Sequence, residues 1–208
     1  RFYFIKNQSQ KFDTSFYSST NIITKHDHLK INFEKFILIY NDIRKFGFIK
    51  LFNKECINSV NHLKSLGIEP LTSQFNFQYL KKKIYNKKTS IKNLLMNQTV
   101  VSGLGNIYVN EALFLSKIKP EKFGNKLANN EIIKLIRSIK KILKNAINAG
   151  GSTIENYHNS EGKIGSYQKN FKVYGREGRC CPRRRCKGNI RRLNHAGRSI
   201  FFCSVCQT

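Results

Sequence analysis

Cys181-Pro-Arg-Arg-Arg-Cys186 and Cys203-Ser-Val-Cys206 are two short cysteine pairs, separated by a basic stretch of this 208-residue chain. Each pair places two thiols on one turn, and two such turns can close around one tetrahedral Zn²⁺ ion. The second pair has the usual two-residue spacing, whereas the first has four intervening residues. The pattern predicts one structural zinc ion held by Cys181, Cys186, Cys203 and Cys206.

A fifth cysteine, Cys180, directly precedes the first pair and competes with Cys181 as the ligand. We favour Cys181, because Pro182 and the Lys187-Gly188 that follows Cys186 form a tight loop, whereas Cys180 belongs to the incoming strand. The alternative to a metal site is a pair of disulfides, or thiols that only pack. Adjacent cysteines fit a disulfide framework poorly, so the metal site is preferred.

The chain is strongly basic and rich enough in apolar residues to be globular. Thirty-eight Lys and Arg against 12 Asp and Glu leave a net charge of +26, with 40% apolar residues. Such an excess favours a polyanionic partner, and nucleic acid is the natural one. No apolar run is long enough to span a bilayer, so no membrane partner is expected. An AT-rich genome also enriches lysine, so charge alone does not specify function.

Hydrophobic periodicity divides the chain into a strand-rich part, a helical part and a final hairpin. Alternating runs at residues 1–5 and 35–40 predict strands, and a break follows at residues 67–70. Residues 128–149 predict a long amphipathic helix with Asn129 or Asn130 as its N-cap, and shorter helices are expected over 90–96 and 106–116. The hairpin strands are expected at residues 190–193 and 199–202, around a turn at 195–197.

Two glycines stand immediately before the predicted helix in Ser102-Gly-Leu-Gly-Asn-Ile-Tyr108. Such glycines leave backbone N–H groups open to a phosphate at the positive end of the helix dipole. Asn106 adds a side-chain donor, and Lys87 and Lys92 flank the same loop. Because glycines before helices often form only a turn, a phosphate contact and a plain turn both remain possible.

Several segments of the chain resemble the formamidopyrimidine-DNA glycosylase family. The matching segments are Lys25-His-Asp-His28, residues 40–47 and 66–71, Gly103-Leu-Gly-Asn-Ile-Tyr-Val-Asn-Glu-Ala112, Gly150-Gly-Ser-Thr153, Tyr174-Gly-Arg-Glu-Gly178 and the finger over residues 181–207. The resemblance implies an α+β fold in three parts. These are the remnant of an N-terminal β-sandwich domain over residues 1–66, a helix-two-turn-helix DNA-binding domain over 67–172, and a zinc-finger β-hairpin over 173–208.

The same resemblance implies DNA base-excision repair. Family members remove oxidised purines, such as 8-oxoguanine and formamidopyrimidines, from damaged double-stranded DNA and then nick the strand. The expected protein is a monomer of the bacterial cytoplasm, associated with the nucleoid through DNA. Three alternatives remain: the pyrimidine-specific branch of the superfamily, a non-catalytic zinc-dependent module that binds damaged DNA, and a zinc ribbon that binds RNA.

Arg44 and Phe46 match the family loop that fills the gap left by an extruded base. The arginine would hydrogen-bond the estranged cytosine while the ring wedges beside it. Ile43 and Lys45 depart from the usual proline and arginine of that loop. Without the resemblance, a hairpin with a buried Phe46 would be the simpler interpretation.

The remaining site residues are also assigned by resemblance. His26, Lys87 and Asn106 match DNA contacts, and Lys92 lies at a neighbouring basic position. Arg198 matches the finger arginine assigned as proton donor in the second strand-breaking elimination. Because an arginine stays protonated, electrostatic stabilisation of the leaving phosphate is an equivalent description of that role.

Part of the family's catalytic machinery has no counterpart in the sequence. The family nucleophile is an amino-terminal proline beside a glutamate, with a further lysine for the first elimination, whereas residue 1 here is Arg. The chain as it stands is therefore expected to bind DNA without catalysis. Ser160-Glu-Gly-Lys-Ile-Gly165, with Tyr167, matches the family loop that closes over the flipped base.

Overall fold

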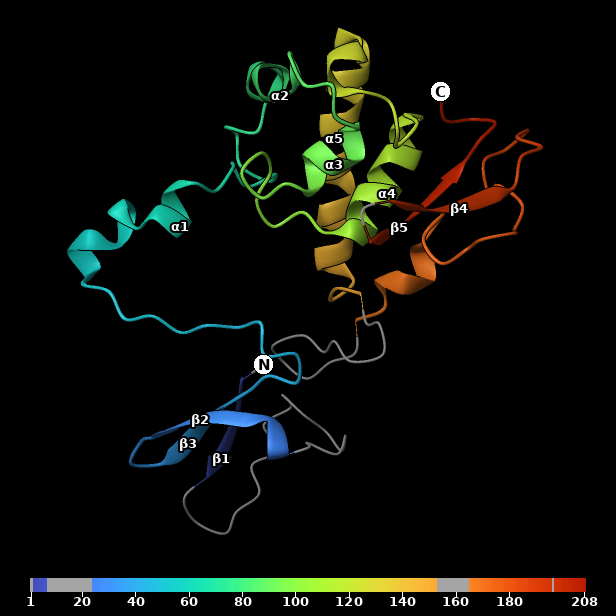
Figure 1. Ribbon diagram of the computed structural model, residues 1–208. Helices are drawn as coiled ribbons and strands as arrows, with labels where there is room; N and C mark the ends of the chain where they lie inside the picture. The colour runs from blue at the N-terminus through green and yellow to red at the C-terminus, as the bar shows by residue number, and fades with distance from the viewer. Residues whose placement is uncertain (1, 7–23, 153–164, 196) are drawn as a thin grey trace. The chain divides into compact units, whose positions relative to one another are not determined.

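The computed structural model describes residues 2–6, 24–152, 165–195 and 197–208 (Figure 1). Contacts group the chain into two compact units, residues 1–54 with 149–168, and residues 55–148 with 169–208. Residues 160–164 of the loop that matches the family's base-closing loop lie outside the described residues.

The first unit contains a three-stranded antiparallel sheet in the order β1-β3-β2. Its strands are β1 (Phe2–Lys6), β2 (Asp27–Asn32) and β3 (Phe36–Asn41), and a short 3-10 helix, η1 (Thr24–His26), leads into β2. Ile39 and Asn41 of the central strand are buried. The strands expected at residues 1–5 and 35–40 are therefore confirmed to within one residue.

The second unit is built mainly from helices. They are η2 (Lys54–Ser59), α1 (Asn61–Lys64), α2 (Phe77–Ile84), α3 (Ile91–Met96), α4 (Asn106–Ser116), η3 (Gly124–Lys126) and α5 (Asn129–Asn148), with η4 (Tyr167–Asn170) at the chain's return from the first unit. The predicted helices at 90–96 and 106–116 are confirmed. Helix α4 contacts both α5 and α3, and α2 also packs on α5 (Figure 1).

Helix α5 has the predicted extent but a different N-cap. Its apolar stripe, which includes Leu135 and Ile139, is buried. The backbone N–H groups of Glu131 and Ile132 donate to the Ala128 carbonyl, so Ala128 occupies the cap position. Its own N–H donates to the Glu131 carboxylate at 2.8 Å. A glutamate at the third helical position therefore supplies the cap in place of the expected Asn129 or Asn130.

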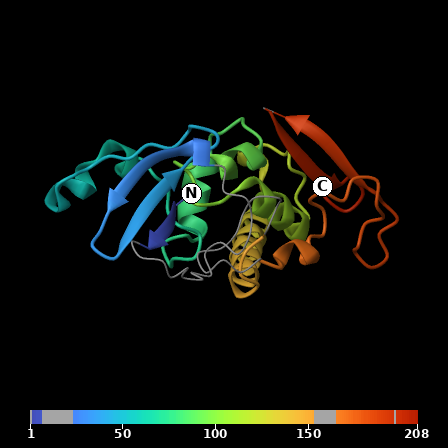
Figure 2. The same cartoon turned by 90° about the horizontal axis from the view of Figure 1, so that it is seen from below.

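The finger is an antiparallel hairpin of β4 (Ile190–His195) and β5 (Arg198–Cys203), each longer than the strand predicted there. Figure 2 shows the hairpin at the edge of the helical unit. Phe201 packs with Phe114 of α4 and with Val173 in one apolar cluster. Strands, helices and a cysteine-rich hairpin together confirm the α+β class.

Candidate metal centre and nucleic-acid interface

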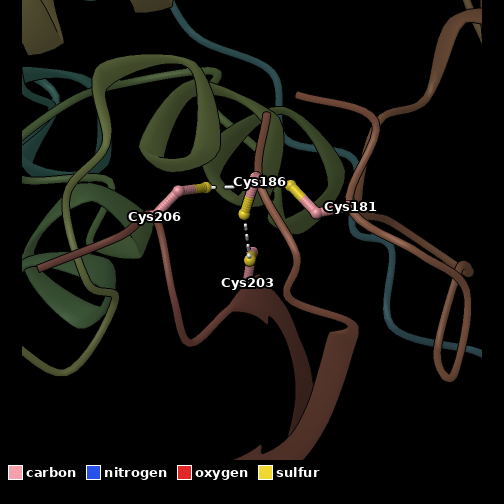
Figure 3. A group of neighbouring side chains, drawn as sticks. All are labelled: Cys181, Cys186, Cys203 and Cys206. Atoms are coloured by element: carbon pink, nitrogen blue, oxygen red, sulfur yellow. Dashed lines mark hydrogen bonds between the residues drawn. The ribbon is translucent and has the colours of Figure 1, made fainter. Parts of the chain in front are cut away.

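Four cysteines converge at the base of the finger, as Figure 3 shows. The sulfur atoms of Cys181, Cys186, Cys203 and Cys206 all lie within 4.8 Å of one another. The Cys181 and Cys206 sulfurs are 3.8 Å apart, and those of Cys186 and Cys203 are 3.6 Å apart. A tetrahedral Zn²⁺ ion with Zn–S bonds of about 2.3 Å needs sulfurs about 3.8 Å apart. The cluster therefore has the donor set and size of a closed tetrahedral metal site.

The competing cysteine lies outside this cluster. Cys180 is exposed and pairs through its backbone with Asn189 in an isolated antiparallel bridge. Cys181, the next residue, is buried, because successive side chains of an extended segment point to opposite sides. The structure thus brings Cys181, and not Cys180, to the other three cysteines.

The surroundings of the thiols shift their pKa values in different directions. Burial raises the pKa of Cys181 to about 12, and burial also raises the pKa of Cys206. Burial is also the largest single influence on Cys203, but hydrogen bonds from the backbone N–H groups of Cys206 and Val205 and from the Cys186 and Cys181 thiols together outweigh it and lower the Cys203 pKa to about 7. N–H groups directed at a sulfur favour its thiolate, which is the form that binds a metal.

Polar contacts anchor the cysteine cluster to the helices. Gln207 Oε1 accepts the Cys203 N–H at 2.9 Å, and its Nε2 donates to the Ile118 carbonyl at 2.8 Å. Between Cys181 and Cys186, the Arg183 side chain donates to the Phe114 carbonyl at 2.8 Å. Its guanidinium also lies 4.9 Å from the centre of the Phe114 ring. Arg183 therefore connects the first cysteine pair to α4.

Two of the predicted DNA-contact residues meet at one backbone carbonyl. Lys92 Nζ lies 3.3 Å and Asn106 Nδ2 lies 3.2 Å from the carbonyl oxygen of Ser199. Lys92 belongs to α3, Asn106 begins α4, and Ser199 follows Arg198 in β5. The turn between the two helices is thereby joined directly to the strand that starts with Arg198.

Lys92 is buried, whereas Arg198 is exposed. Burial and, to a smaller extent, the positive charge of Arg198 lower the pKa of Lys92 to about 8. The charge of Arg198 acts on Lys92, and neither cation is paired with a carboxylate among the described residues. Together they create a local positive potential. Such an arrangement suits an anionic ligand such as a phosphate.

The glycine turn before α4 is only partly open. Gly103 has a φ of 72° and donates its N–H to the Gln98 side chain at 2.8 Å. The expected free N–H at this position is therefore already bound, because Gln98 from the preceding turn reaches it. Gly105 is the N-cap of α4, and a Cβ there would meet no atom within 4 Å. Lys87 lies in the loop after α2 with an exposed side chain.

The sequence analysis assigned no role to two buried polar residues of α4, which connect this helix to β5 and to residues 172–174. Asn110 donates to the Asn106 carbonyl at 2.7 Å and accepts the Phe201 N–H at 2.9 Å. The Glu111 carboxylate accepts the N–H groups of three consecutive residues, 172, 173 and 174, at 2.9 to 3.1 Å. In the sequence, both residues lie in the segment 103–112 that resembles the family.

In the first unit, Asp42 shapes the loop that carries Arg44 and Phe46. Its carboxylate accepts hydrogen bonds from the Tyr40 hydroxyl at 3.0 Å, the Arg44 N–H at 3.1 Å and the Gly47 N–H at 2.8 Å. The bond from Gly47 is the main reason that the pKa of Asp42 lies below its ordinary value. Asp42 lies within the segment 40–47 that resembles the family, but the sequence predicted no role for it.

The two predicted DNA-inserting side chains stack on each other at the surface. The Arg44 guanidinium lies 5.0 Å from the centre of the Phe46 ring. Phe46 is 78% exposed, so the simpler interpretation of a buried Phe46 is wrong. An exposed aromatic ring costs solvation free energy unless a partner covers it.

His26 ends η1, and its carbonyl accepts the Asp42 N–H at 3.0 Å. His28 Nε2 lies 2.9 Å from the Asp42 carbonyl oxygen, and Asp27 accepts a hydrogen bond from Asn41 at 2.8 Å. The His26 and His28 contacts are both with the Asp42 backbone, whereas the Asp27 carboxylate binds Asn41. Among the described residues, the four finger cysteines alone form a cluster with metal-binding geometry.

Comparison with known proteins gives consistent matches. The model of the formamidopyrimidine-DNA glycosylase H2TH domain matches residues 66–158. A formamidopyrimidine-DNA glycosylase of Rickettsia bellii is 44% identical over 188 residues, which cover 89% of this chain and 67% of that protein. One from Bartonella quintana is 39% identical over 202 residues, or 92% of this chain and 69% of that protein. The chain thus spans about two thirds of the length of these relatives.

Solved structures agree over the whole chain. A Lactococcus lactis formamidopyrimidine-DNA glycosylase bound non-covalently to DNA with an abasic site superposes with a TM-score of 0.81 at 35% identity, covering 100% of this chain and 70% of that one. A second Lactococcus lactis complex, with DNA that contains a formamidopyrimidine lesion, gives a TM-score of 0.82 at 36% identity, covering 100% and 71%. No helix among the described residues is long and apolar enough to cross a membrane.

Proposed function

The chain belongs to the formamidopyrimidine-DNA glycosylase family, and we propose that the protein acts in base-excision repair as a DNA glycosylase and abasic-site lyase for oxidised purines. The observation that carries the proposal is the end-to-end structural match to relatives bound to damaged DNA. The partner is damaged double-stranded DNA, bound by a monomer in the bacterial cytoplasm, at the nucleoid. The net charge of +26 supports a polyanionic partner of this kind.

For the finger, we propose that Zn²⁺ is the metal and that its role is structural. Four thiolates without an open position are typical of structural zinc sites, which stabilise the fold rather than activate water. The metal would hold the base of β4 and β5 while the tip carries Arg198. We also propose that the chain is divided into three parts, which are residues 1–66, 67–172 and 173–208. The domain match that begins at residue 66 supports the first boundary.

For the DNA contacts, we propose that Lys87, Lys92 and Asn106 bind the sugar-phosphate backbone and that His26 makes a further contact. The contact of Lys92 and Asn106 with the Ser199 carbonyl supports a shared phosphate site beside Arg198. In that position the guanidinium of Arg198 stabilises the leaving phosphate during strand cleavage. Because Ser199 directly follows Arg198, its contacts with α3 and α4 fix the position of the Arg198 backbone.

For lesion recognition, we propose that Arg44 and Phe46 fill the space left by the extruded base. Extrusion costs a few kcal/mol of unstacking, and a ring inserted beside the estranged base recovers part of it. The exposure of Phe46 and its stacking with Arg44 support this role. The three hydrogen bonds to Asp42 would keep the loop in shape before DNA binds.

The test extends the chain at its amino end with the family segment that begins Pro-Glu. Borohydride treatment with duplex containing 8-oxoguanine opposite cytosine is expected to trap a covalent adduct, because the terminal amine forms a Schiff base with C1′. Absence of trapping in the folded, zinc-loaded protein would sink the proposal. Activity on oxidised pyrimidines alone would assign the protein to the pyrimidine-specific branch.

The chain without that extension provides the second arm of the test. We expect it to bind lesion duplex in a strongly salt-dependent manner without nicking the strand. That result, together with no trapping by the extended protein, would favour a non-catalytic module for damaged DNA. Preference for RNA over lesion duplex would instead favour the zinc-ribbon alternative.

A further inference from the structure

A basic cavity of about 800 Å³ lies in the second unit, between the C-terminal end of α4 and the part of α5 up to Lys141. None of its lining residues belongs to the cysteine cluster or to the proposed DNA contacts. The charged side chains that line it are those of Lys117, Lys122, Glu131, Lys134, Arg137 and Lys141. Five cations therefore face this cavity together with one carboxylate.

Only one of these cations is neutralised within the unit. Lys122 Nζ lies 2.8 Å from Glu131 Oε1, and Lys122 thereby has its ion pair. The side chains of the other four cations, Lys117, Lys134, Arg137 and Lys141, have no acidic partner among the described residues. The lining side chains therefore carry an excess of four positive charges, and the last residue, Thr208, also lines the cavity.

The spacing of the charges on α5 concentrates them on one face. Lys134 and Arg137 are three residues apart, and Arg137 and Lys141 are four apart, so consecutive turns bring them together. Like charges at these spacings destabilise a helix slightly, and a bound anion would remove that cost. A purely solvated face would gain nothing from this arrangement.

The lining also has an apolar part, which distinguishes between classes of anion. Leu115, 37% exposed, and Ala128 line the same cavity. A duplex presents mainly phosphates on a convex, rigid surface, and it would leave this concave apolar part uncovered. An acidic peptide offers carboxylates together with apolar side chains and can follow a concave surface.

We propose that this cavity docks an acidic peptide segment of a partner protein. Its carboxylates pair with Lys134, Arg137 and Lys141, while an apolar side chain packs on Leu115. The cavity adjoins the C-terminal end of α4, whereas Asn106 starts the same 11-residue helix about 15 Å away. Lesion duplex and the peptide therefore have separate contacts, and the proposal does not depend on glycosylase activity.

The experiment uses a fluorescein-labelled synthetic peptide of alternating Glu, Asp and Leu, with binding to the zinc-loaded chain followed by anisotropy. Arg137→Glu and Lys141→Glu are each expected to weaken binding about tenfold or more, which corresponds to about 1.4 kcal/mol for a lost charge contact. Lys144→Glu is the matched control, since Lys144 is exposed on α5 with the same charge but does not line the cavity. It is expected to weaken binding much less.

Three results would overturn the proposal. Equal weakening by Lys144→Glu would mean that only the overall charge of the chain attracts the peptide. Undiminished binding of a peptide with Ser in place of Leu would show that no apolar contact contributes to binding. Tighter binding of a single-stranded oligonucleotide of equal charge, lost in Arg137→Glu and Lys141→Glu, would assign the cavity to nucleic acid. Unchanged circular dichroism and zinc content would show that each variant is folded.

Discussion

Lys92 Nζ lies 3.3 Å from the carbonyl oxygen of Ser199, which joins a buried lysine of the helical part to the strand that presents Arg198. A buried ammonium group with a single carbonyl acceptor is poorly solvated, and burial accordingly lowers the pKa of Lys92 to about 8. An incoming phosphate would supply the missing counter-charge. This is the counter-charge expected if, as proposed, Lys92 binds the sugar-phosphate backbone.

Replacement of Lys92 by methionine should weaken binding of lesion duplex about tenfold at pH 7. Methionine has a similar length and stays buried, so the loss would come from the charge. Fluorescence anisotropy at several salt concentrations provides the measurement. The salt dependence should also decrease by about one phosphate contact.

The pH dependence of duplex binding provides an independent check on Lys92. Because the pKa is about 8 in the free protein, Lys92 is charged below that pH and loses its proton above it. Affinity should be level below about pH 7 and fall as pH rises through 8, and the Lys92→Met variant should lack that fall. A wild-type affinity that is flat between pH 7 and 9 would contradict the assignment.

Glu111→Gln should destabilise the second unit by about 2 to 4 kcal/mol, measured by urea unfolding. The carboxylate is buried and accepts backbone N–H groups at residues 172, 173 and 174, whereas the amide would point an NH₂ group at some of these donors. Glu121→Gln is a suitable control, because Glu121 makes an exposed ion pair with Lys119. Its effect should be within about 0.5 kcal/mol.

Zinc content separates the two adjacent cysteines. The wild-type chain and Cys180→Ser should each bind one zinc ion per chain, whereas Cys181→Ser and Cys203→Ser should lose it and lower the unfolding temperature. Protons compete with the metal for thiolates, so the affinity for zinc should fall as pH decreases. Loss of zinc from Cys180→Ser with retention by Cys181→Ser would show that the ligand assignment is wrong.

Local patterns in the sequence were sufficient for much of the fold. The extent of α5 follows from its 3.6-residue apolar period, and that of α4 from the glycines before it. The cap of α5 was missed because the Glu131 side chain, rather than an asparagine, satisfies the Ala128 N–H. Cap chemistry depends on which of several polar residues reaches the backbone.

Long-range polar contacts could not be predicted from local patterns. The contacts of Asn106 with Ser199 and of Asn110 with Phe201 connect residues more than 90 positions apart, and neither serine nor asparagine signals such a partner. No role was predicted for Arg183, which packs on the Phe114 ring. The cysteine cluster was predictable because four thiols with short spacings have few other arrangements.

Asp42→Ala should weaken binding of duplex with 8-oxoguanine opposite cytosine and reduce its preference over undamaged duplex. The loop from Asp42 to Gly47 depends on one carboxylate that accepts from Tyr40, Arg44 and Gly47. Without it, Arg44 and Phe46 would lose their preorganised positions, and ordering them would cost entropy on binding. Asp42→Asn keeps one carbonyl acceptor and should retain part of the preference. Anisotropy titrations with both duplexes would measure it, and an unchanged preference in Asp42→Ala would show that DNA binding alone orders the loop.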